Sequence, residues 1–308
     1  MHSFTLPTIP TIEDAELRQQ LQTILDNKTK PQGSLGRLES LAVKLGLIQG
    51  TTQPKIERPQ IRVFAADHGL AQHGTSAFPS EVTAQMVLNF LNGGAAINVI
   101  ARQHDIALKV VDAGVAADFA EFGVNQHPQL LDYKVRLGSR DALAEPAMTL
   151  EECIAALQSG MEIAKALEGN LLICGEMGIG NTSAASLLLA KLTDTPLAEC
   201  IGRGTGLDET GLQHKLQVLS QVLKRYEAVT EPLEILAAVG GLEIAMMAGA
   251  YIQAAHDRRV LLVDGFIASS ALLVAERLVP GVSQFAIFAH SSVEPGHRHM
   301  LQALDAQP

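Results

Sequence analysis

The chain has 308 residues, of which 47% are hydrophobic and 18% charged, with no tryptophan and 4% aromatic residues. A core built from Ala, Leu, Ile and Val is typical of a helix-rich α/β enzyme and argues against a β-sandwich. The formal net charge of −10 argues against a nucleic-acid-binding surface, because no basic stripe is available to neutralise phosphates.

The first 60 residues are predicted to form a small helical subdomain. Residues 13–29 carry apolar side chains at helical spacing, at Leu17, Leu21, Ile24 and Leu25. Pro31 and Gly33 end this helix, and Ser34 is predicted to cap a second one. Residues 50–60 read as a linker. We therefore divide the chain into an N-terminal helical arm, residues 1–60, and a Rossmann-like α/β domain, residues 61–308.

From residue 61 the pattern alternates between strands and helices. Apolar runs lie at residues 61–66, 107–111, 171–174, 260–263 and 285–289. Helical patterns lie at residues 82–105, 149–168, 181–193, 209–229, 232–256 and 268–278. Continuous apolar runs are typical of strands covered on both faces, so we predict a doubly wound, mainly parallel sheet. The five strand ends should line one crevice, with the irregular residues 116–148 as a surface excursion or lid.

The stretch from Leu171 to Ala185 is the strongest local signal. Four apolar residues lead into a glycine-spaced turn and then into a helix. Such a junction directs backbone N–H groups and the helix dipole at one point, where glycines let an anion approach. The spacing fits neither a Walker loop nor Gly-x-Gly-x-x-Gly. We predict a phosphate-sized anion site formed by Gly175, Gly178, Gly180, Asn181 and Thr182. The alternative is a glycine-rich turn that only packs well.

Two carboxylates are candidates for a catalytic base. Glu176 lies inside the anion loop, where it makes sense only if it faces a proton or a positive charge on the ligand. We expect the helix dipole and nearby N–H groups to keep it ionised at neutral pH, as a base requires. A role in orienting the ring or the loop stays open. Glu294 is the second candidate, although Pro295-Gly296 after it suggests a turn.

A second glycine cluster is a further phosphate candidate. Gly202, Gly204 and Gly206 alternate with Arg203 and Thr205, a pattern that can form a backbone nest. Lys215 lies one or two turns into the following helix. An ordinary helix-to-helix loop is the alternative, although it would need fewer glycines.

The remaining polar strand ends are less specific. Asp264-Gly265 could bind ribose hydroxyls. Asp67-His68 could supply a base or a structural cap. The histidines near the C-terminus do not predict a metal site, because no Cys or carboxylate spacing supports one and a His-x-His in a polar tail is usually solvated; they are His290, His297 and His299.

The chain shows no leader-like or membrane-spanning pattern and has three cysteines without CxxC spacing, Cys153, Cys174 and Cys200. Buried thiols and a reducing compartment fit these cysteines. We therefore expect a cytoplasmic protein without a membrane partner.

Several long segments occur together in a fixed order: Lys30–Glu39, Ala66–Gly69, Gly175–Thr182, Val239–Gly241, Asp264–Phe266 and His290–Glu294. Together they closely resemble the nicotinate-nucleotide:dimethylbenzimidazole phosphoribosyltransferase family. The resemblance covers nearly the whole chain from about residue 13, and several ordered motifs are far more specific than a lone glycine loop.

The resemblance implies a homodimer with a Rossmann-like large domain and a small domain built partly from N-terminal helices. It implies transfer of ribosyl 5-phosphate from nicotinate mononucleotide to a benzimidazole, during cobalamin assembly, without metal or cofactor. Phosphate and ribose would be held by residues 175–182 and 202–206, Lys215 and Ser292. The benzimidazole would lie near Phe78, Ser80, Gln85 and Met86.

One departure concerns the general base. In the family it is a glutamate in a Gly-Glu-Gly segment some two dozen residues beyond the stretch matching His290 to Gly296, whereas this sequence ends at Pro308. The sequence is then either a shortened version of a longer protein, or another carboxylate supplies the base. A catalytically weak or inactive nucleotide- or benzimidazole-binding homologue is therefore the alternative to an active transferase.

Overall fold

A computed structural model describes residues 4–204 and 206–308. In this part of the chain six parallel strands form one sheet with the order β3-β2-β1-β4-β5-β6. The strands are β1 (Gln60–Ala66), β2 (Ala107–Gly114), β3 (Leu130–Asp132), β4 (Leu171–Met177), β5 (Val260–Val263) and β6 (Ala286–Phe288). This is the doubly wound order of the Rossmann fold, so the predicted fold class is confirmed. The prediction missed β3, which has three residues and lies inside the predicted irregular segment.

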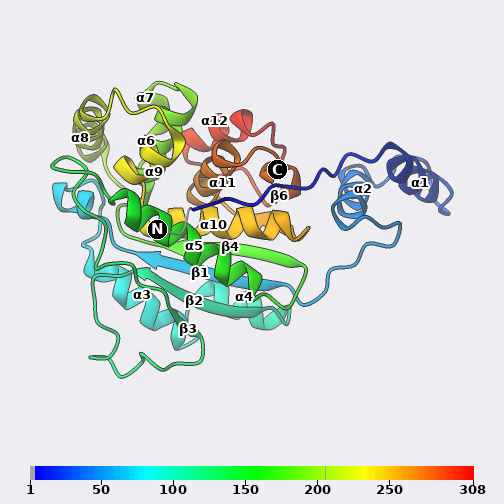
Figure 1. Cartoon of the computed structure of the whole chain (residues 1–308), viewed down its shortest axis with the longest axis horizontal. Coiled ribbons are helices and arrows are strands. Elements are labelled where there is room, and N and C mark those ends of the chain that lie inside the picture. Colours follow the sequence, from blue (N-terminus) through cyan, green and yellow to red (C-terminus); the bar gives the residue numbers. More distant parts are fainter. Residues whose placement is uncertain (1–3, 205) are drawn as a thin grey trace.

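Helices cover both faces of the sheet, which explains the unbroken apolar runs (Figure 1). On β1, Ile61, Val63 and Ala65 pack with α3 (Glu81–Leu91) and the neighbourhood of α4 (Ala96–Gln103). The alternate residues Phe64 and Ala66 belong to the larger core on the other face. That face is covered by α5 (Leu150–Lys165), α10 (Leu242–His256) and α11 (Phe266–Leu278). Successive side chains point to opposite faces of a strand, so most of β1 is apolar. The exceptions are Gln60 and Arg62, which are buried and hydrogen-bonded to each other.

Glycine pairs divide two of the predicted helices. The pattern at 82–105 is broken between α3 and α4, where Gly93 has a φ of +72°. The pattern at 232–256 is broken at Gly240 and Gly241, between α9 (Pro232–Val239) and α10. By contrast, α6 (Asn181–Thr193) has the predicted bounds. The other elements are η1 (Gly69–His73), α7 (Leu197–Cys200), α8 (Glu209–Arg225), η2 (Val282–Phe285) and α12 (Pro295–Ala303).

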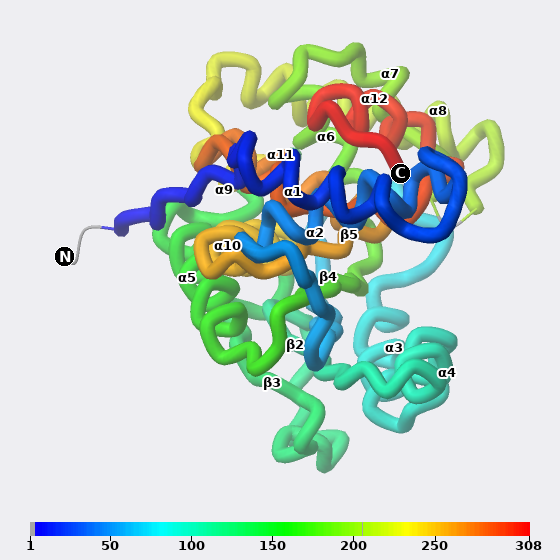
Figure 2. Tube along the Cα trace, turned by 90° about the vertical axis from the view of Figure 1, so that its right-hand side faces the viewer, coloured from blue at the N-terminus to red at the C-terminus, as the bar shows by residue number. Residues whose placement is uncertain are grey.

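Two N-terminal helices, α1 (Ala15–Asp26) and α2 (Arg37–Gln49), project from one end of the body (Figure 1) and lie in front of it when the molecule is seen from that end (Figure 2). Asp14 caps α1, but the predicted cap Ser34 is wrong, because α2 begins at Arg37 after Gly36. The Arg258 guanidinium, just beyond α10, donates to the carbonyls of Leu47 and Ile48 and so ties α2 to the body.

The stretch Glu81–Gln103 is apolar enough, by length and composition alone, to resemble a membrane span, with a mean hydropathy of 1.2. In the structure this stretch is divided between α3 and α4, and 33% of its most apolar window is buried. Core helices of soluble proteins pass the same test, so a single such stretch is weak evidence for a span.

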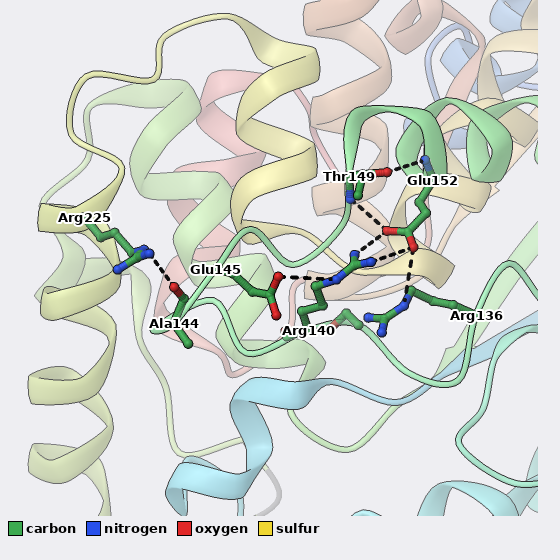
Figure 3. A network of polar contacts seen from close by, with 8 residues as sticks. Arg136, Arg140, Ala144, Glu145, Thr149, Glu152 and Arg225 are labelled. Atoms are coloured by element: carbon green, nitrogen blue, oxygen red, sulfur yellow. Dashed lines mark hydrogen bonds and ion pairs between the residues drawn. The ribbon is translucent and has the colours of Figure 1, made fainter.

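The segment 116–148 is fastened to the body rather than free (Figure 3). Arg140 makes a bidentate pair with Glu152 of α5, with Nη2 to Oε1 at 2.9 Å, and Arg136 approaches the same carboxylate at 3.5 Å. Glu152 also completes the capping box of α5 with Thr149. Near the sheet, the Ser139 N–H donates to the Asp67 carbonyl at 2.8 Å. The predicted excursion therefore forms a tethered wall beside the end of β1.

Helices α5 and α10 approach closely at two glycines. A methyl group added at Gly160 would overlap the carbonyl oxygen of Met246, and one at Gly249 would overlap that of Leu157. Because both obstacles are backbone atoms, a side chain at either position forces the helices apart.

We predict that Gly160→Ala lowers the free energy of unfolding by about 2 kcal/mol or more, despite the higher helix propensity of alanine. Gly211→Ala in α8 is the matched control, because its nearest neighbour is the flexible Leu207 side chain at 3.0 Å. Urea unfolding measures both variants, and equal stability changes would contradict the prediction.

Candidate active site

The chain adds strands on one side of β1 first and then, from β4, on the other side. Ligands bind at such a switch point in doubly wound folds. A cavity of about 360 Å³ opens at the carboxyl ends of β4 and β5. The loop from β4 to α6 forms one wall. The other lining residues include Thr75, Ser76, Arg203, Gly204, Asp264, Ser292 and Glu294. Thr75 and Ser76, just after η1, carried no sequence signal that singled them out.

The β4–α6 loop is held against β1 by glycine-dependent contacts. A methyl group at Gly178 would lie 2.5 Å from the Ala66 carbonyl oxygen, and Gly180 adopts a φ of +97°. The loop then enters α6, whose N-terminus faces the cavity through Asn181 and Thr182. The predicted anion-loop residues therefore line one cavity beside a helix N-terminus, an arrangement that attracts anions.

Glu176 lines this cavity and is half-buried. The Asn181 side-chain amide donates to its Oε2 atom. Burial, together with the carboxylates of Glu243 and Asp264, raises the pKa of Glu176 to about 7, against the opposing effects of Asn181 and His68. The expectation of a fully ionised Glu176 is therefore wrong, because burial beside other acids outweighs the helix dipole. A carboxyl group with this pKa can accept a proton near neutral pH.

A buried ion pair lies close to the same loop. His68 Nε2 is 2.7 Å from Glu243 Oε1, and both side chains are buried. Burial lowers the pKa of His68, but the carboxylates of Glu243, Asp67 and Glu176 outweigh this effect and the pKa is raised. Sequence reasoning missed Glu243. The sequence feature that could have revealed it is an acidic residue at the second position of the largely apolar helix α10.

The second glycine cluster and Lys215 meet the anion loop. Lys215 is fully buried, and its Nζ donates to Thr182 Oγ1 at 3.0 Å and to the Gly202 carbonyl at 3.5 Å. Burial lowers the pKa of Lys215 to about 8, although the Glu294 carboxylate raises it. The Gly204 N–H donates to Glu294 Oε1 at 3.1 Å. Thr205 of this cluster lies outside the described residues.

Of the C-terminal histidines, His297 is buried and does not lie in a solvated tail. Glu294 precedes α12 as its N-cap residue, with Pro295 at the first helical position, so the predicted turn is instead a helix start. His297 is fully buried between Ser269 and the Ser292 N–H, which donates to its Nδ1 at 2.8 Å. Its role in the structure is therefore to position Ser292. Asp264 and His290 lie 3.5 Å apart at the rim. Within the described ranges, no three His, Cys, Asp or Glu side chains form a metal-binding group.

A second cavity of about 340 Å³ lies along α3. Its walls include the predicted base-binding residues Ser80 and Gln85; its other lining residues are Asp67, Glu81, Ala84, Leu88, Ala116, Ala117 and Phe122. The structure does not bring Phe78 and Met86 to these walls. Phe78 is 50% exposed, and Met86 packs against the core beneath α3. The Ile179 N–H of the anion loop donates to Thr83 Oγ1 of α3 at 3.1 Å, so the two cavities are near neighbours.

Comparison with known proteins decides the family. A family model described as phosphoribosyltransferase matches residues 11–308. The chain belongs to this phosphoribosyltransferase family. Nicotinate-nucleotide–dimethylbenzimidazole phosphoribosyltransferases from Variovorax paradoxus and Cupriavidus taiwanensis are each 54% identical to it, over 99% and 98% of the chain and 86% of each relative.

Solved structures agree with this phosphoribosyltransferase assignment. The chain is similar to CobT from Thermus thermophilus, with a TM-score of 0.90 and 43% identity over 95% of this chain and 87% of that one. A second structure, named nicotinate-nucleotide-dimethylbenzimidazole phosphoribosyltransferase from the same organism, gives a TM-score of 0.89 at 42% identity, over 96% and 88%. The protein is therefore a transferase with the Rossmann-like fold of these neighbours.

The raised pKa of Glu176 predicts how stability depends on pH. Its folded pKa of about 7 exceeds the ordinary value of 4.5, so the folded state binds the proton more tightly and loses stability as pH rises between these values. Glu176→Gln removes this loss. We expect the variant to gain about 2 kcal/mol relative to wild type between pH 4.5 and 8, less than the full shift because the cavity admits solvent.

Urea unfolding at several pH values measures this gain. Glu162→Gln, an exposed site on α5, corrects for the general change in charge. A Glu176→Gln difference that does not vary with pH would show that the carboxyl group titrates normally.

Proposed function

We propose that this phosphoribosyltransferase transfers ribosyl 5-phosphate from nicotinate mononucleotide to 5,6-dimethylbenzimidazole, giving α-ribazole 5′-phosphate and nicotinate for cobalamin assembly. The observation that carries the proposal is the pair of cavities at one switch point, separated by the contact between Ile179 and Thr83. The names of the relatives supply the two substrates. A reaction that moves ribosyl phosphate from one ring to another needs two adjoining pockets, one for the nucleotide and one for the accepting ring.

The mononucleotide fits the larger cavity in this proposal. Its phosphate would bind the N-terminus of α6 and the nest of Gly202 and Gly204, with Lys215 as the cation. The ribose would contact Asp264 and Ser292, which line the same cavity. The benzimidazole would enter the second cavity beside Ser80 and Gln85.

The proposed reaction exchanges one glycosidic bond for another. The bond between ribose C1′ and the pyridinium nitrogen breaks, and its electron pair returns to nitrogen, so nicotinate leaves with an uncharged ring and needs no acid catalyst. One benzimidazole nitrogen attacks C1′ from the opposite face, and the N–H proton on the other nitrogen must be lost. A carboxylate within hydrogen-bond reach accepts that proton. Holding both rings across one ribose supplies much of the remaining rate.

Glu176 is the proposed proton acceptor. It lies in the cavity wall and has a pKa of about 7, so near neutral pH it is partly ionised and can release the proton again. Glu294 is the weaker candidate, because its carboxylate is engaged with the Gly204 N–H. A role for Glu176 in orienting the ring is the alternative. A binding protein without turnover is less favoured, since relatives 54% identical are named as transferases.

We also propose a cytoplasmic homodimer with no nucleic-acid or membrane partner and no cofactor. The net charge of −10 supports the absence of nucleic acid, and three free, buried cysteines fit a reducing compartment. Leu35 and Leu38 of the arm, 50% and 64% exposed, offer apolar surface to a second subunit.

Chromatography of released nicotinate tests the proposed function. We expect nicotinate and α-ribazole 5′-phosphate to appear in equal amounts when the mononucleotide and dimethylbenzimidazole are both present, with little nicotinate when either is omitted. Calorimetry should show binding of the mononucleotide. Binding without turnover would favour the binding-protein alternative, and binding of a dinucleotide instead would favour an oxidoreductase.

Glu176→Gln tests the proposed base, because it keeps the size and hydrogen bonding of the side chain. We expect kcat to fall by roughly 10²-fold or more with the affinity for the mononucleotide little changed. In wild type, kcat/KM should rise with pH through about 7 as Glu176 loses its proton, and the variant should lack this rise. An unchanged kcat would eliminate Glu176 as the base, while weaker binding at constant kcat would assign it to positioning.

A further inference from the structure

The carboxylate of Glu294 lies in the nest where the proposed function places the substrate phosphate. Its Oε1 accepts the Gly204 N–H at 3.1 Å. Its Oε2 lies so close to Gly202 that a methyl group at Gly202 would overlap it. Its charge also acts on the buried Lys215 ammonium from close by. An anion therefore already fills the nest, and that anion belongs to the protein.

The carboxylate is poorly satisfied in this position. Glu294 Oε2 is buried and has no hydrogen-bond partner. The Lys215 Nζ donates its hydrogen bonds to Thr182 Oγ1 and to the Gly202 carbonyl, not to the Glu294 carboxylate. An unpaired buried carboxylate oxygen is costly. A phosphate, with three acceptor oxygens, can use the Gly204 N–H, the lysine and the α6 N-terminus together.

Phosphate and carboxylate cannot share the nest. Both are anions, and one buried ammonium cannot neutralise a phosphate and a carboxylate in contact with it. The chain before Glu294 can accommodate a rearrangement, because His290 and Ser291 are exposed and Val293 is 98% exposed. The Glu294 N–H donates to Ser292 Oγ at 3.1 Å, so Ser292 is linked to the same carboxylate through the chain.

We propose that Glu294 is a stand-in for the substrate phosphate: its carboxylate occupies the nest of Gly202, Gly204 and Lys215 in the empty protein and leaves when phosphate binds. The inference rests on the proposed function for the location of the phosphate. It gives Glu294 control over the affinity of the enzyme for phosphorylated substrate. It also removes Glu294 from the candidates for the general base.

Calorimetric titration with inorganic phosphate, at fixed pH and ionic strength, tests this inference without a nucleotide. We expect Glu294→Gln to bind phosphate about fivefold or more tightly than wild type, because the binding-competent state no longer competes with a carboxylate. Glu227→Gln is the matched control. It removes the same charge, but Glu227 is exposed just after the C-terminal end of α8, away from the nest; its affinity should stay within about twofold of wild type.

Glu294→Asp keeps the charge and a good N-cap residue for α12, so it serves if the glutamine variant folds poorly. Its carboxylate is withdrawn by one methylene, and phosphate should again bind more tightly than in wild type. Equal or weaker phosphate binding in the folded variants would overturn the inference, and weaker binding would assign Glu294 to supporting the glycine loop.

The outcomes separate the two proposals. Tighter phosphate binding in Glu294→Gln, together with no nicotinate release by wild type, would reject the proposed reaction and keep the stand-in. Turnover by wild type with no gain in phosphate affinity in the variants would support the proposed reaction and reject the stand-in. If neither wild type nor the variants bind phosphate, the nest is not an anion site and the inference is wrong.

Discussion

The parallel pairing of β1 with β4 is the constraint on which the site depends. In this register Phe64 lies beside Glu176, and the strand ends bring the Ala66 carbonyl against Gly178. Only glycine permits this approach, which fixes the start of the anion loop relative to β1. The chain then leaves β1 on one side of the sheet and β4 on the other, so a crevice opens between them. The two cavities near this crevice follow from that one pairing.

Buried charge is the second organising feature. Because the chain has a net charge of −10, attraction for a bound anion has to be local. Buried Lys215 and the α6 N-terminus provide it, while Glu176 and Glu243 sit on the other side of the same loop. The Glu243 carboxylate raises the pKa of Glu176, and His68, which pairs with Glu243, opposes this effect. Low-dielectric surroundings strengthen the attraction of Lys215 for an anion and make Glu176 easier to protonate.

Much of the fold was accessible from sequence, because its signals are local. The strand–glycine–helix junction that ends in Gly180 predicted α6 to the residue, and the apolar runs predicted five strands. The pairing of His68 with Glu243 was not accessible, since the two residues are 175 positions apart and meet only through the sheet. The protonation of Glu176 likewise depends on burial by distant elements. Three-residue β3 is too short for any periodicity.

Helix α10 links the site to the N-terminal arm. Its second residue, Glu243, pairs with His68. Just beyond its last residue, the Arg258 guanidinium donates hydrogen bonds to the carbonyls of Leu47 and Ile48 at the end of α2. Its 15 residues span about 22 Å, and it packs closely against α5 at Gly160 and Gly249. The contact with α2 and the pair of Glu243 with His68 thus lie at opposite ends of one helix. When α2 shifts on contact with another surface, α10 is the helix that transmits this shift to the pair of His68 and Glu243 beneath the anion loop.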